Sequence, residues 1–141
     1  MKKLSALIIG ILLVVTIFII FSNESLTYEE LVTEMIDDED VRYITVEMES
    51  QDERTVASIE EDDVVNDLLN EPADMVLEEE SSSTPPVLEN QITFHTTHNS
   101  YTLHFDRDRI VSGSTAYTVD GQSEHALYNQ ISNTDLNWDT E

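Results

Sequence analysis

The side chains most able to do chemistry in this chain are imidazoles and carboxylates, because the sequence contains no cysteine. His95 and His104 lie in two runs of alternating apolar and polar residues that predict a β-hairpin. A turn at His98-Asn99 would place both imidazoles diagonally on one face. With a carboxylate such as Asp106 or Asp108, two imidazoles at that spacing could bind Zn²⁺. The alternative is a polar sheet face with two solvent-facing histidines, and this is what we expect. The sequence therefore predicts no metal site.

Runs of acidic residues offer oxygen ligands, which Ca²⁺ prefers. Such runs occur at residues 37–40 and 60–63 and at the pair Asp106 and Asp108. None follows the twelve-residue calcium loop, which needs a central glycine and a final glutamate. We therefore expect solvated charge runs that attract cations diffusely, without a specific cation site.

Catalytic motifs are missing from the sequence. A nucleophilic serine needs a sharp strand-to-helix turn such as G-x-S-x-G, and Ser112-Gly113-Ser114 has neither that spacing nor that context. Carboxylate pairs are not diagnostic, because 30 acidic residues form pairs by chance. With three glycines the chain has no phosphate-binding loop. We expect a protein that is not an enzyme and that needs no cofactor.

The net charge of −24 excludes nucleic acid as a partner, because phosphate contacts need clustered lysine and arginine. Both lysines precede residue 4, and every acidic residue lies at or after Glu24. Repulsion among these acids destabilises a folded domain in dilute buffer but is screened within about 3 Å at 1 M salt. The composition therefore suits salty or alkaline surroundings. The alternative is an acidic binding face for a cationic partner.

The N-terminus predicts attachment to a membrane. Lys2 and Lys3 precede an uncharged, apolar run over residues 4–21, which as a helix would reach about 27 Å, enough to span the hydrocarbon core. A cleaved signal peptide is the alternative, but no pair of small residues follows the run, since a cut after Ser22 would put Ile20 at a position that favours small side chains. We expect a retained single-pass anchor with the N-terminus in the cytoplasm and the rest of the chain outside the cell.

Local patterns predict the first elements after the anchor. Apolar spacing from Tyr28 to Ile36 predicts an amphipathic helix, and Thr27 with Glu30 fits a capping box. Further along, alternation and turn residues predict a strand at 41–48, a return strand at 54–59, a helix at 60–69 that ends before Pro72, a strand at 75–77 and a loop at 80–90.

The second half of the chain predicts a meander of strands. With a turn at His98-Asn99, Phe94 pairs with Leu103 and Ile92 with Phe105, so that one face is continuously apolar. Short strands at 110–111 and 115–119 follow. A final helix is expected, with Ser123 as its cap and residues 127 and 131 pointing inward.

These elements predict an α+β fold, in which an N-terminal transmembrane helix is followed by a small, mainly antiparallel sheet with two to three short helices. We divide the chain into a cytoplasmic lysine pair with a signal anchor (1–22), an acidic juxtamembrane helix (23–40), an extracytoplasmic domain (41–132) and a polar, frayed tail (133–141). Trp138 is the tail's only expected anchor.

Over residues 41–132 the elements follow one order and apolar spacing, which is carried by Ile44-Thr45-Val46, the helix at 60–69, Ile92-Thr93-Phe94, Tyr101-Thr102-Leu103, Ile110-Val111, Tyr117-Thr118-Val119 and Leu127 to Ile131. This pattern resembles small exported domains of unknown function in Bacillus-type bacteria. Those domains occur as lipoproteins or on one membrane helix. Because this chain lacks the lipobox cysteine, the resemblance implies attachment by the helix.

A second, shorter resemblance covers residues 4–46. Leu26 to Leu31, followed by Val41, Ile44 and Val46, is similar to the start of the exterior domain of membrane-bound AAA proteases. The nucleotide-binding and zinc motifs of those proteases are absent, so no protease activity is implied.

The sequence therefore predicts a single-pass membrane protein that displays a highly acidic, non-catalytic interaction module, with a protein of the cell envelope as its partner. Two alternatives stay open at this point. One is a structural domain that folds in response to Ca²⁺ or another divalent cation. The other is a small membrane regulator that acts through its transmembrane helix, where Gly10 would allow close helix packing.

Overall fold

Three helices and nine strands make up the computed structural model, which describes residues 26–50, 52–81, 84–119 and 124–140. The helices are α2 (Tyr28–Ile36), α3 (Asp62–Asn70) and α4 (Ala126–Asn133). The strands are β1 (Leu26–Thr27), β2 (Tyr43–Ser50), β3 (Glu53–Ile59), β4 (Val76–Glu79), β5 (Asn90–His95), β6 (Ser100–Phe105), β7 (Arg109–Ser112), β8 (Thr115–Val119) and β9 (Asp139–Thr140).

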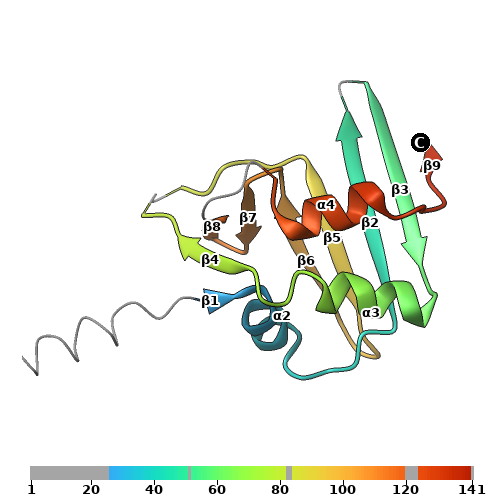
Figure 1. The fold of residues 1–141 in the computed structure, drawn as a ribbon, viewed down its shortest axis with the longest axis horizontal. Helices are drawn as coiled ribbons and strands as arrows, with labels where there is room; N and C mark the ends of the chain where they lie inside the picture. Colours follow the sequence, from blue (N-terminus) through green and yellow to red (C-terminus); the bar gives the residue numbers. More distant parts are fainter. Residues whose placement is uncertain (1–25, 51, 82–83, 120–123, 141) are drawn as a thin grey trace, which may run out of the picture.

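The strands form one antiparallel sheet in the order β1-β4-β8-β7-β6-β5-β2-β3-β9 (Figure 1). This confirms the predicted α+β class with a mainly antiparallel sheet. Among the described residues, no helix is long and apolar enough to cross a membrane. The expected anchor at residues 4–21 lies outside them.

Helix α2 begins as its sequence predicts. The Thr27 hydroxyl accepts a hydrogen bond from the Glu30 amide at 3.3 Å, and the Glu30 carboxylate accepts one from the Thr27 amide at 2.8 Å, which completes the capping box. The helix ends at Asp37 and Asp38, whose φ angles of 53° and 57° are in the left-handed region. Short polar side chains tolerate this conformation better than branched ones, so these acids end the helix.

Helix α4 begins at a different cap from the one that its sequence predicts. His125 is the N-cap, and its Nδ1 accepts a hydrogen bond from the Tyr128 amide at 3.0 Å. The prediction of Ser123 as the cap is therefore wrong, because the imidazole of His125 already caps the amide of Tyr128, the third residue of the helix. Ser123 itself lies outside the described residues.

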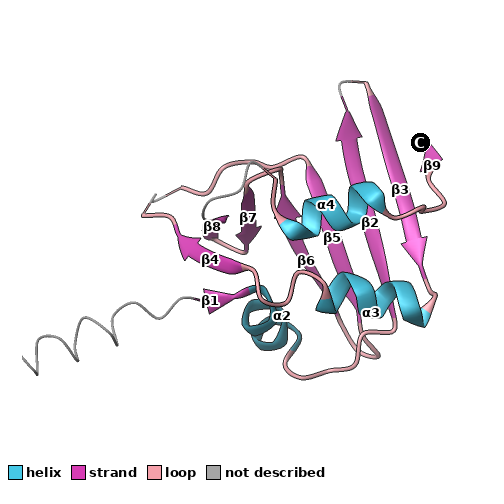
Figure 2. Ribbon diagram, viewed as in Figure 1, coloured by secondary structure: helices cyan, strands magenta, loops and turns pink. Residues whose placement is uncertain are grey.

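The core lies between the three helices and one face of the sheet. Figure 2 shows α3 and α4 in front of the strands. The helices bury Tyr28, Leu31, Val32, Ile36, Val65, Leu68, Leu127 and Ile131 against inward strand residues that include Ile44, Val46, Ile92, Phe94, Leu103, Phe105 and Ile110. The segment that we assign to a juxtamembrane helix thus shares one core with the strands that follow it.

The central hairpin of β5 and β6 has a register that differs from the prediction by two residues. Ile92 pairs with Leu103 and Phe94 with Tyr101, because the turn is centred on Thr97-His98 instead of His98-Asn99. The Thr96 amide donates to the Asn99 carbonyl at 2.9 Å, and the Asn99 amide donates to the Thr96 hydroxyl at 3.0 Å. A shift of two residues leaves every side chain on its predicted face, whereas a shift of one would have reversed them.

A pair of cysteines can test this register in a chain that has none of its own. Thr93 lies opposite Thr102, with their hydroxyls 2.9 Å apart, so we expect a Thr93→Cys/Thr102→Cys variant to form a disulfide in mild oxidant. Loss of free thiols measured by mass spectrometry reports its formation. The control is Thr93→Cys/His104→Cys, the pair that the His98-Asn99 turn would place opposite each other. Faster closure of the control would contradict the register.

The C-terminal tail contributes to the sheet. Asp139 and Thr140 form β9 and pair with Val56 and Thr55 of β3, so the prediction of a frayed tail is wrong for these residues. The preceding Trp138 is 37% exposed. The free edge of β3 provides backbone donors and acceptors for the tail, and such long-range pairing leaves no local pattern in the sequence.

Candidate functional site

His95 is engaged in contacts on the sheet face that carries no described helix. Its Nε2 lies 3.0 Å from the Thr45 hydroxyl and its Nδ1 lies 2.8 Å from the Ser100 hydroxyl. The ring stacks on Tyr43 with centroids 4.1 Å apart and planes 8° apart. Partial burial lowers the pKa of His95 below its usual value. Both ring nitrogens therefore have hydrogen-bond partners, and the ring serves as a packing element.

His104 is exposed and does not lie near His95. In the observed register His95 is opposite Ser100 while His104 is opposite Gln91, so the two histidines are separated by four residues along the hairpin, about 13 Å. The prediction that they lie diagonally across the hairpin is wrong, because it depended on the turn at His98-Asn99. These two residues are not brought together as ligands for one metal ion.

Asp106 and Asp108 stabilise the turn between β6 and β7. The Asp106 carboxylate accepts hydrogen bonds from the Asp108 and Arg109 amides at 3.1 and 2.8 Å, and Arg109 Nη2 lies 3.0 Å from it. Burial alone would raise the pKa of Asp106, but these amides and the Arg109 guanidinium outweigh it, and the pKa is lowered. Asp108 lies 3.8 Å from Arg109 Nε. The pair is thus held by an arginine.

The described parts of the chain contain no group of three or more His, Asp or Glu side chains that could hold a metal ion. Acidic residues do line an open hollow of about 480 Å³ along α2, where Glu29, Glu34, Asp37 and Asp38 lie. Their charges attract cations diffusely, and the hollow is open to solvent.

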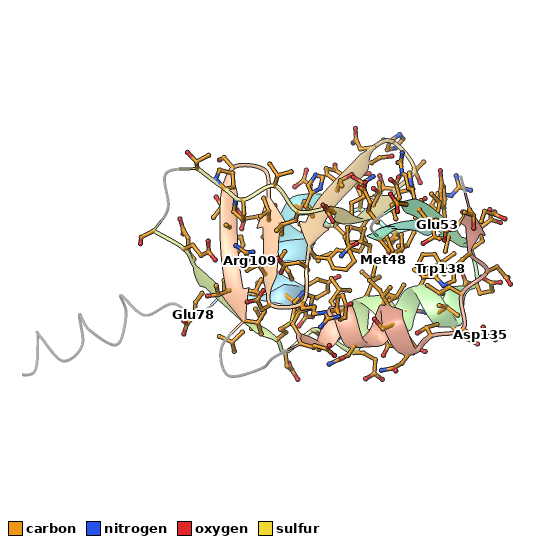
Figure 3. The ribbon with its side chains drawn as sticks, turned by 90° about the horizontal axis from the view of Figure 1, so that it is seen from above. Met48, Glu53, Glu78, Arg109, Asp135 and Trp138 are labelled. Carbon is orange, nitrogen blue, oxygen red and sulfur yellow. The ribbon has the colours of Figure 1, made fainter. Side chains whose placement is uncertain are left out.

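A shallow groove of about 340 Å³ lies on the face of the sheet opposite α2, α3 and α4. It is lined by Glu47, Met48, Glu49, Arg54, Val87, Leu88, Glu89, Gln91 and His104. Figure 3 places Met48 toward the same end of the molecule as Trp138, away from Glu78 and Arg109. Neighbouring strands β2, β5 and β6 supply the floor, and the segment before β5 supplies one side.

The electrostatics of this groove are set by three glutamates and one arginine. Arg54 forms an ion pair with Glu47. The ladder of β2 and β5 ends at Glu47 and Gln91, and beyond it the Glu49 amide donates to the Asn90 side chain at 3.1 Å. Glu49 and Glu89 both line this end of the groove, and on its other side Glu49 lies opposite Arg54 of β3. With three carboxylates and one guanidinium, the groove has an excess of negative charge that a cationic group would offset.

The side of the groove is apolar and fixed in place. Leu88 is buried against Val111 and Ala116 in a small cluster separate from the main core. This contact holds the neighbouring Val87 outward, where 96% of it is exposed. Exposing so large an aliphatic side chain to water costs free energy. A partner that covers Val87 would remove this cost.

Sequence patterns do not identify this groove. Glu49 and Glu89 are each one acid among 30, and they become neighbours only through the pairing of β2 with β5, which are far apart in the chain. The one local signal is the aliphatic pair Val87-Leu88, which follows Pro85-Pro86 in an otherwise polar loop. The sequence predicts His104 on the polar face of its strand, but no pattern makes it a neighbour of Glu47.

Comparisons with known proteins found no matching family model, no matching curated protein and no matching solved structure. The resemblance to exported domains of Bacillus-type bacteria stays a prediction. Function is therefore argued from the residues of this chain and their geometry.

Proposed function

We propose that this protein is a non-catalytic, membrane-attached module that binds a protein partner at the cell exterior through the helix-free face of its sheet. The observation that carries the proposal is the one-sided arrangement of the fold: α2, α3 and α4 bury their apolar residues against one face, while the opposite face carries an open groove. Apart from the part where Leu88 covers Val111 and Ala116, this face is not needed for a core and is free to contact another molecule.

Attachment to the membrane is the part of the proposal that rests on sequence. Residues 4–21 form the anchor, Lys2 and Lys3 stay in the cytoplasm, and the acidic domain lies outside the cell. Its charge keeps the domain soluble in salty or alkaline surroundings. The anchor ends at residue 22, and the acidic helix that follows packs in the same core as the sheet.

A binding role is favoured over a catalytic one because His95 and Asp106, two of the residues able to do chemistry, take part in structural contacts. His95 is held by Thr45, Ser100 and Tyr43, and Asp106 closes a turn. The face is favoured over the edges of the sheet, because the outermost strands β1 and β9 have two residues each and offer little backbone for another strand to pair with.

Site-specific photo-crosslinking in the full chain tests the proposal. A photoreactive amino acid at Ser58 or His104, both exposed on the helix-free face, should form an adduct with a single envelope protein in the host membrane. The same group at Asp67 of α3 or Glu29 of α2 should form none, because these exposed residues lie on the helices. Mass spectrometry identifies the adduct. Adducts from the helices alone, or none from either face, would contradict the proposal.

A further inference from the structure

We propose that the groove beside Val87 binds an extended, basic segment of the partner protein in which lysine or arginine alternates with apolar residues. This inference rests on the proposed function, since it names the chemistry of the partner for the same face. It follows from three features of the groove: its charge, the spacing of its carboxylates and its apolar side.

The charge of the groove selects a cation. Glu49 and Glu89 both line the groove, and neither forms an ion pair within the described residues. Arg54 lies opposite Glu49 in the ladder of β2 and β3, but it forms its ion pair with Glu47. A lysine or arginine side chain placed between Glu49 and Glu89 gains an attraction to each. The groove thus attracts a basic group specifically at this point.

The spacing of the carboxylates selects an extended peptide. Glu47 and Glu49 lie two residues apart on the same face of β2, about 7 Å along the strand. Alternate side chains of an extended peptide repeat at the same distance. A peptide that runs along β2 can therefore direct one basic side chain to Glu49 and Glu89 and the next one to Glu47, whose carboxylate it shares with Arg54.

The apolar side of the groove selects what lies between the basic residues. Val87 is 96% exposed and is held in position by Leu88, which packs on Val111 and Ala116. An aliphatic side chain of the peptide covers Val87 and removes apolar surface from water. A bare metal ion gains nothing from this contact, and the described residues contain no cluster of three ligands for one.

Peptide binding to the full chain in nanodiscs of phosphatidylcholine tests the inference, because this lipid has no net charge to attract a basic peptide. The probe is the fluorescein-labelled peptide Lys-Val-Lys-Val-Lys, followed by fluorescence anisotropy. Glu49→Gln/Glu89→Gln should weaken its binding about tenfold. The matched control, Glu29→Gln/Glu34→Gln on α2, removes the same charge at exposed positions outside the groove and should change the affinity less than about twofold.

Two further arms separate the apolar contact from the charge. Val87→Ser should weaken the binding of Lys-Val-Lys-Val-Lys several-fold but leave the binding of Lys-Ser-Lys-Ser-Lys unchanged. Equal losses in the groove variant and the α2 control would mean diffuse attraction to an acidic surface, and would overturn the inference. A saturable change in melting temperature with CaCl₂ at matched ionic strength, lost in Glu49→Gln/Glu89→Gln, would place a divalent cation in the groove and would also overturn it.

The outcome distinguishes this inference from the proposed function. Adducts from Ser58 and His104 without peptide binding would support a partner on the helix-free face and contradict a basic segment as the part that binds. Peptide binding at the groove without such adducts would support the groove as a peptide site and contradict the proposed envelope partner.

Discussion

Tyr28→Ala should lower the free energy of unfolding by about 3–5 kcal/mol, whereas Tyr28→Phe should raise it by about 1 kcal/mol. The side chain is fully buried in the main core, so its truncation leaves a cavity beside Leu31 and Val32. Its hydroxyl has no hydrogen-bond partner within the described residues, so removing that oxygen relieves a desolvation cost. Urea unfolding followed by circular dichroism measures both changes.

The same residue predicts sensitivity to alkali. Burial raises the pKa of Tyr28 above its usual value, while in the unfolded chain the phenol loses its proton near pH 10. The contribution of Tyr28 to stability is therefore full below about pH 10 and decreases as the pH rises above it. Tyr28→Phe should lose less stability between about pH 9 and 11 than the parent chain. Equal losses in the two proteins would contradict the burial of this phenol.

His125→Ala should lower the free energy of unfolding by about 2–3 kcal/mol, because it removes both the cap of α4 and a buried ring. The ring is fully buried, packs 6.2 Å from Phe105 between ring centroids, and accepts the Tyr128 amide hydrogen bond on Nδ1. His125→Asn retains a capping oxygen and should cost less. Thermal melts at pH 7 measure both.

The titration of His125 predicts acid sensitivity. Burial lowers the pKa of His125 and outweighs the pull of the Asp106 and Arg109 backbone and of the Asp106 and Asp108 carboxylates. Because the unfolded state binds the proton more readily, the contribution to stability is full above about pH 6.5 and is lost as the pH falls below it. His125→Asn should flatten this decline between about pH 7 and 5.5, where most carboxylates stay ionised. His98→Asn, in an exposed turn, is the control and should leave it unchanged.

The sequence predicts those elements that are stabilised by contacts between residues close together in the chain. Thr27 and Glu30 define the start of α2 because their capping contacts span three residues. The alternation around Phe94 predicts the faces of β5 and β6, but not their register, because the Thr96 hydroxyl takes part in closing the turn. The cap of α4 was assigned to Ser123 since serine is a common cap, whereas the burial of His125 beneath Phe105 is a tertiary effect.

The candidate groove could not be predicted, for a different reason. Its carboxylates cannot be told from the other acidic residues of the chain, and Glu49 and Glu89 come to line one groove only when β2 pairs with β5. The exposure of Val87 likewise follows from Leu88, which packs on strands β7 and β8. Composition did indicate a cationic partner as one possibility, but it could not locate the contact.

The strand order has a consequence for how the chain folds. β5, β6, β7 and β8 pair with their neighbours in sequence, so they can form from local contacts, whereas Leu26 pairs with Leu77 and Ile44 with Phe94 across long loops. Closing such loops costs entropy and slows folding. During synthesis the N-terminal half leaves the ribosome first, so its strands cannot complete the sheet until the second half follows. During that interval the apolar side of α2 has no core to join, and we expect it to be the segment most exposed to proteases and most in need of a chaperone.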